Sequence, residues 1–147
     1  MTRPQLKHVL LLTAILAIAA FGGLTGCSPE DKPLPTPEGV QVVQGPYEPD
    51  KEEYGDVLVV SWDVVKDDRV DGYVIYRAEQ GLGPTAGEKT EFVLQALTFA
   101  LKYEDEDIHT TDLYPTMKYF YTISVITEDG TVGPMSEEVE IEYAPLG

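Results

Sequence analysis

The chain has one cysteine, two histidines and few basic residues, and each of these scarcities excludes a class of function. Its single Cys, Cys27, leaves no disulfide within the 147 residues. Ten Lys and Arg residues stand against 26 Asp and Glu residues, which gives a formal net charge of −16. Such a chain repels phosphate backbones and anionic headgroups, so we expect no nucleic-acid partner and no electrostatic docking to a membrane.

A long hydrophobic run is also missing, since a helix that crosses a bilayer takes about 20 apolar residues. The longest run, residues 9–21, has 13 residues and follows the basic residues Arg3 and Lys7. A run of this length behind a short basic region is typical of a signal peptide. We therefore interpret residues 1–26 as a leader. Because the leader carries two basic residues and no acidic one, its removal changes the net charge from −16 to −18.

The leader ends in Leu24-Thr25-Gly26-Cys27, which resembles the lipobox of bacterial lipoproteins. This resemblance implies cleavage between Gly26 and Cys27, a covalent lipid such as palmitate on Cys27, and attachment to a membrane of the cell envelope. In enterobacterial members of the family an Asp after the cysteine favours the inner membrane, and Ser28 stands there instead. The resemblance therefore favours the outer membrane. The alternative is an ordinary cleavage site with an incidental cysteine.

Residues 27–37 are predicted to form a tether. Residues 28–37 (SPEDKPLPTP) include four prolines and almost no apolar side chain. Polyproline-like chain rises about 3.1 Å per residue, so we expect a stalk of roughly 30 Å at most. The folded domain is then predicted over residues 38–147.

An alternating pattern of apolar and polar residues begins at Val40 and predicts half-buried strands. The strands are expected at residues 40–43, 57–62, 73–77, 119–127 and 138–143. Residues 92–101 are apolar without clean alternation, which indicates one or two strands or, alternatively, a short helix. Residues 81–87 are expected to be a surface loop, and Gly72 and Gly130 are expected to need positive φ.

Three segments resemble the fibronectin type III family. Residues 60–62 (Val-Ser-Trp), 72–77 (Gly-Tyr-Val-Ile-Tyr-Arg) and 113–119 (Leu-Tyr-Pro-Thr-Met-Lys-Tyr) are similar to its second strand, its third strand and its tyrosine corner. The resemblance covers about residues 36–143. It implies an all-β, immunoglobulin-like antiparallel sandwich of about seven strands, with Trp62 in the core and the Tyr119 hydroxyl bonded to backbone. One departure is Thr116, where the family usually has Gly.

Catalysis is not expected. The mature chain has one His, His109, and no free thiol once Cys27 is modified. A triad of His109 with Ser124 or Ser136 is formally conceivable, but the strand pattern places His109 in a loop and Ser124 on an outer strand face.

Two candidate binding sites remain. Glu104, Asp105 and Asp107 belong to a dense set of hard oxygen ligands of the kind that Ca²⁺ takes, and the alternative is a solvated acidic loop. The other candidate is Tyr76 with Phe120, whose outward positions predict an exposed apolar patch. The alternative is that residues 81–101 fold over this pair.

The last strand carries Glu138, Glu140 and Glu142 on one side. We expect these carboxylates to point outward and to discourage pairing of sheet edges. The sequence thus predicts a non-catalytic, lipid-anchored binding or spacer module that requires no cofactor. Its expected partners are the membrane, through the anchor, and a protein or polysaccharide. The alternative function is calcium-assisted binding of a carbohydrate or a protein.

Overall fold

The computed structural model describes residues 32–45, 47–48, 53–54 and 57–145. The predicted leader, the cleavage site at Gly26 and the lipidation site at Cys27 lie outside these residues. The compact unit spans Lys32–Gly147. Within the described ranges, no helix has the length and apolar character needed to span a bilayer.

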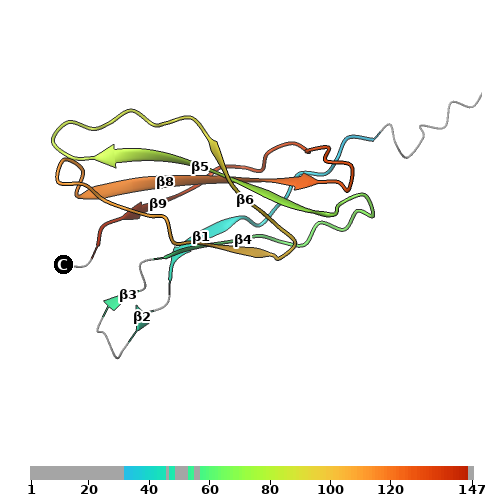
Figure 1. Ribbon diagram of the computed structural model, residues 1–147, viewed down its shortest axis with the longest axis horizontal. Coiled ribbons are helices and arrows are strands. Elements are labelled where there is room, and N and C mark those ends of the chain that lie inside the picture. The colour runs from blue at the N-terminus through green and yellow to red at the C-terminus, as the bar shows by residue number, and fades with distance from the viewer. Residues whose placement is uncertain (1–31, 46, 49–52, 55–56, 146–147) are drawn as a thin grey trace, which may run out of the picture. The chain divides into compact units, whose positions relative to one another are not determined.

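Seven strands form two antiparallel sheets (Figure 1). The three-stranded sheet has the order β1-β4-β7, and the four-stranded sheet has the order β6-β5-β8-β9. The strands are β1 (Gln41–Gln44), β4 (Leu58–Ser61), β5 (Gly72–Leu82), β6 (Val93–Thr98), β7 (Lys102–Asp105), β8 (Thr116–Ile126) and β9 (Val139–Tyr143). A separate hairpin pairs β2 (Tyr47–Glu48) with β3 (Glu53–Tyr54). The prediction of an all-β antiparallel sandwich is confirmed.

The core lies between the two sheets and consists of the inward positions that alternation predicts. Trp62 packs against Tyr73 with 5.3 Å between ring centroids. Because β8 lies between β5 and β9, its inward residues contact both neighbours and are fully buried. The buried core residues include Leu58, Val60, Trp62, Tyr73, Ile75, Tyr119, Tyr121, Ile123 and Val125.

Residues 72–105 differ from the expectation in three ways. Strand β5 continues through Gly81 to Leu82, opposite Met117 and Thr116, so the surface loop begins later than predicted. Residues 92–101 form β6 and a turn, and the chain then enters the other sheet as β7, so the helical alternative is wrong. Gly72 begins β5 in ordinary strand conformation, whereas Gly130 has a φ of 86° as expected.

The predicted tether is partly folded onto the sandwich. The Arg69 guanidinium donates hydrogen bonds to the carbonyl oxygens of Lys32 (2.7 Å) and Pro33 (3.3 Å). Leu34 packs against the core, and Pro37 is fully buried. An apolar residue between prolines can cover core surface without regular structure, which composition alone does not show. The compact unit therefore includes residues 32–37 of the segment that we interpret as a tether.

Candidate functional site

The tyrosine corner is present as the sequence predicts. The Tyr119 hydroxyl donates a hydrogen bond to the His109 carbonyl at 2.8 Å and accepts one from the His109 N–H at 2.7 Å. Burial raises the pKa of Tyr119, so the hydroxyl stays protonated and can donate. This pair of bonds ties the loop before β8 to the body of the sandwich.

A buried ion pair joins the two sheets next to this corner. Asp105 at the end of β7 is fully buried and accepts hydrogen bonds from Arg77 Nη1 (2.9 and 2.8 Å) and from the Tyr121 hydroxyl (2.7 Å). Burial opposes the charge on Arg77, but its hydrogen bonds and attraction to Asp105 outweigh this effect and raise its pKa. Burial followed by the charge of Asp105 raises the pKa of Tyr121. Asp105 is therefore an internal counter-ion of Arg77.

The candidate calcium ligands do not converge. Glu104 and Asp105 are successive residues of β7, so Glu104 points to solvent and binds Lys102 at 2.8 Å while Asp105 points inward. The side chain of Asp107 is 91% exposed and lies 3.7 Å from Arg77. In the part of the chain that is described, no three Asp, Glu, His or Cys side chains are grouped so as to hold a metal ion. The expectation that Asp105 lies in a solvent-facing acidic set is wrong, because its register opposite Leu58 directs it into the core.

The predicted Tyr76–Phe120 face is covered. Phe120 does point outward from the sandwich, yet only 5% of it is exposed, and Tyr76 is half-buried. Lys89, in the loop between β5 and β6, places Nζ 4.0 Å from the centroid of the Phe120 ring and 4.9 Å from that of Phe92. The same Lys89 pairs with Glu138. Phe120 therefore forms no exposed pair with Tyr76, and Lys89 of the segment after β5 covers its ring.

Among the described residues, five of the ten exposed large apolar side chains lie on and beside β6 instead. Figure 1 shows β6 followed by the chain that crosses to the other sheet. We call five side chains the β6 patch, and their exposed fractions run from 42% at Leu101 to 71% at Phe99. The patch consists of Val93, Leu94, Leu97, Phe99 and Leu101. Val93 lies opposite Arg77, whose side chain points inward, so it is on the other face of the sheet from Leu94 and Leu97. Exposed apolar side chains gathered along one segment are typical of contact surfaces.

The β6 patch combines side chains with an open strand edge. Strand β6 pairs with β5 on one side and ends the strand order on the other. A register shift opposite Ile75 and Tyr76 inserts one extra residue, so Leu94 lies opposite Tyr76 and Leu97 lies opposite Val74. Both leucines therefore share the outer face of the sheet although they are three residues apart.

The serine and histidine residues are not arranged for catalysis. His109 lies beside Tyr119 at the start of β8, whereas Ser124 is five residues further along the strand, about 17 Å away at 3.4 Å per residue. Ser136 Oγ accepts a hydrogen bond from the Ile123 N–H and donates one to the Glu137 carbonyl. These contacts tie Ser136 to backbone, and among the described residues the buried Ser124 hydroxyl has no hydrogen-bond partner.

Strand order, the buried Trp62 and the Tyr119 corner together define the architecture. It is a fibronectin type III-like sandwich. A comparison with solved structures returns "Myokine structure" at 21% identity and a TM-score of 0.47, covering 78% of this chain and 98% of that one. Two domains of human fibronectin type III domain containing protein 3 are also similar. One of them is 16% identical with a TM-score of 0.49, and the match covers 78% of this chain and 89% of that one. The other, the sixth domain, is 19% identical with a TM-score of 0.47, and the match covers 83% of this chain and 95% of that one. No protein-family model and no curated protein matches the sequence.

Sequence reasoning missed the β6 patch, although a signal for it exists. Residues 92–101 contain no charged residue, while 24% of the whole chain is Asp, Glu, Lys or Arg. An uncharged run of this length in an acidic chain favours either burial or a contact surface. The structure shows that it is not fully buried.

Proposed function

We propose that the chain is a lipid-anchored, non-catalytic binding and spacer module of the bacterial cell envelope, attached to the outer membrane through Cys27. The observation that carries this proposal is the position of the sole cysteine at the end of a signal-peptide-like leader and directly before a folded domain. Several acyl chains bind a membrane essentially permanently, whereas a single one binds only marginally. The net negative charge of the domain disfavours electrostatic docking to anionic headgroups.

The start of the compact unit at Lys32 makes this spacer short. Cys27 and Lys32 are five residues apart, and a fully extended chain spans at most about 3.6 Å per residue, or roughly 18 Å here. That reach is little more than half of the stalk expected from residues 28–37. Because Arg69 holds the carbonyls of Lys32 and Pro33, the chain leaves the domain at a fixed place beside the start of β5.

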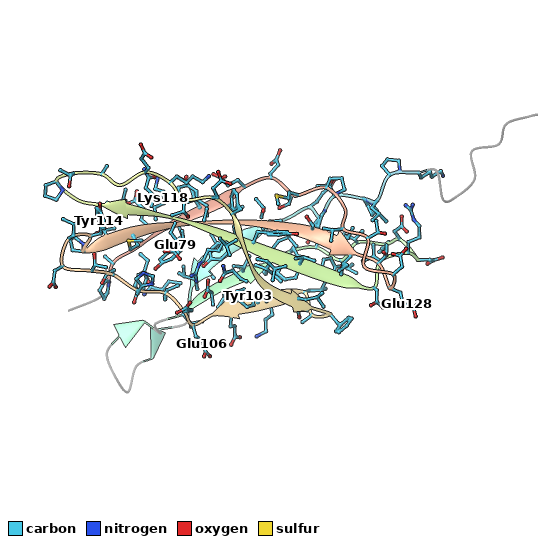
Figure 2. The ribbon with its side chains drawn as sticks, turned by 45° about the horizontal axis from the view of Figure 1, so that its top comes forward. Glu79, Tyr103, Glu106, Tyr114, Lys118 and Glu128 are labelled. Atoms are coloured by element: carbon cyan, nitrogen blue, oxygen red, sulfur yellow. The ribbon has the colours of Figure 1, made fainter. Side chains whose placement is uncertain are left out.

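The described chain enters the sandwich at one end of the domain. Leu34 and Pro35 lie against Gly133, so the β8–β9 connection belongs to the same end. Figure 2 shows Glu128 of that connection and Tyr114 of the tyrosine corner at opposite ends of the domain.

The anchor is tested with the full chain in a bacterial host fed an alkyne-bearing palmitate. We expect label on the wild-type protein and none on Cys27→Ser, which should also retain its leader by mass spectrometry. Ser28→Ala is the matched control and should stay labelled. An unlabelled wild-type chain with a free thiol at Cys27 would overturn the proposal.

The choice of membrane is tested separately by density fractionation of the envelope. We expect the wild-type chain with the outer membrane and Ser28→Asp with the inner membrane, because the resemblance assigns that role to Asp after the cysteine. Equal distribution of the two chains would refute the assignment to the outer membrane while leaving the lipid anchor intact.

A further inference from the structure

The two edges of the four-stranded sheet have opposite chemistry. At one edge, β9 exposes Glu140 and Glu142, which pair with Lys118 of β8 at 3.1 and 3.6 Å. Carboxylates in this position repel an approaching strand, as the sequence predicts. At the other edge, β6 carries no charged residue and exposes Leu94 and Leu97.

We propose that the β6 edge pairs, antiparallel, with the β6 edge of a second copy of this chain and so joins two four-stranded sheets into one. An edge strand presents unpaired backbone N–H and C=O groups, and a second strand satisfies them. The same step removes apolar side chains of the β6 patch from water, which stabilises the pair of strands. The β6 edge thus offers an added strand both backbone hydrogen bonds and contacts with apolar side chains.

Charge identifies the second copy as the partner. A charged strand would gain only backbone hydrogen bonds here, because residues 92–101 offer no opposite charge to pair with its side chains. Another β6 has matching length and matching apolar side chains. In a two-fold arrangement the same patch serves on both subunits, so Leu94 and Leu97 of one copy lie next to those of the other. Two chains of net charge −18 can approach at this side because β6 itself adds no charge.

The chemistry of β9 limits the assembly to two copies. In the paired state both β6 edges are used, and the two outer edges are the acidic β9 strands. Each of them carries Glu140 and Glu142 toward solvent. We therefore expect a closed dimer and no fibre.

Antiparallel pairing places the two chain entries at opposite ends. Thr98 at the end of β6 lies opposite Tyr73 at the start of β5, close to Arg69, which holds Lys32. Reversing the second copy moves its Lys32 to the other end of the pair.

Sedimentation equilibrium of residues 32–147, which contain the whole core, tests the pairing without the anchor. Stable complexes bury at least about 1,200 Å² of surface, and a single pair of short strands buries less than this. We therefore expect a weak dimer that forms at protein concentrations between roughly micromolar and millimolar. Leu97→Lys should weaken association at least tenfold. Leu113→Lys is the matched control, because Leu113 is 59% exposed outside β6 and Leu97 is 52% exposed.

Equal circular dichroism and melting of the three proteins establishes that the variants fold. A monomer at every concentration would overturn the proposal, and would leave the edge for a different strand. Equal weakening by the two variants, or growth of the wild type beyond two copies, would overturn it as well. None of these results bears on the lipid anchor, which the palmitate labelling tests.

Direction is tested with a spin label on Asp71→Cys in residues 32–147, which contain no other cysteine. Strand spacings of about 4.8 Å and rises of about 3.3 Å place the two labels roughly 25 Å apart or more in the antiparallel pair and roughly 15 Å apart in a parallel one. The longer distance is expected. The shorter distance would refute the antiparallel arrangement.

Discussion

Replacing Asp105 by Asn tests whether this carboxylate is a counter-ion of the core. Asp105 accepts two contacts from Arg77, one from the Tyr121 hydroxyl and one from the Asp107 N–H at 3.1 Å. Removing one partner of a buried ion pair typically costs about 3–5 kcal/mol. Arg77 keeps Glu79 at 2.7 Å, and Asn keeps the shape and one acceptor oxygen. We therefore expect a loss near the lower limit, about 3 kcal/mol.

The assay is urea unfolding of residues 32–147, with the melting temperature as a second readout, where this loss corresponds to roughly 10–20 °C. Asp107→Asn makes the same chemical change at a side chain that is 91% exposed, and should cost less than about 0.5 kcal/mol. Equal losses in the two variants would refute the buried-pair account. A rise of the wild-type midpoint with millimolar Ca²⁺, reduced in both variants, would support the calcium interpretation instead.

Three further predictions concern local contacts. Tyr119→Phe removes the two hydrogen bonds of the corner and should cost about 2 kcal/mol in the free energy of unfolding; an unchanged melting temperature would contradict this. Lys89→Ala should expose the Phe120 ring and cost about 0.5–1 kcal/mol, with increased binding of a hydrophobic dye as the check. Hydrogen bonds from Arg69 lower the pKa of Asp67 from 3.8 to about 2. Its contribution to stability is therefore complete above about pH 4 and lost as the pH falls toward 2, and a carboxyl NMR midpoint near 3.8 would contradict it.

The alternation of apolar and polar residues predicted the strands that have one face in the core and the other face outside it. Tyr73 and Ile75, and likewise Tyr119 and Tyr121, are two residues apart and share the core side. In β6 the same rule fails because the bulge opposite Ile75 and Tyr76 breaks the period of two. The sequence of residues 92–101 therefore shows apolar character without showing which side chains face outward.

The errors at the candidate site have a different physical cause, because they depend on residues distant in the chain. The outward direction of Phe120 follows from alternation, but its cover comes from Lys89, 31 positions earlier. Asp105 is one of four consecutive acidic residues, and it differs from them by its buried partners Arg77 and Tyr121, which are 28 and 16 positions away. Long-range pairing of this kind leaves no local pattern.

The balance between apolar attraction and charge repulsion at β6 predicts an unusual salt dependence. The side chains that meet in the dimer are uncharged, whereas the two approaching domains carry the same strongly negative charge. Raising the ionic strength from 0.01 M to 1 M shortens the Debye length from about 30 Å to about 3 Å, which removes the repulsion and leaves the attraction. Association of the wild-type domain should therefore strengthen with NaCl in sedimentation experiments, while Leu97→Lys stays monomeric at both extremes. If association weakened with salt, opposite charges would be holding the two copies together, and an uncharged strand edge could not be the interface.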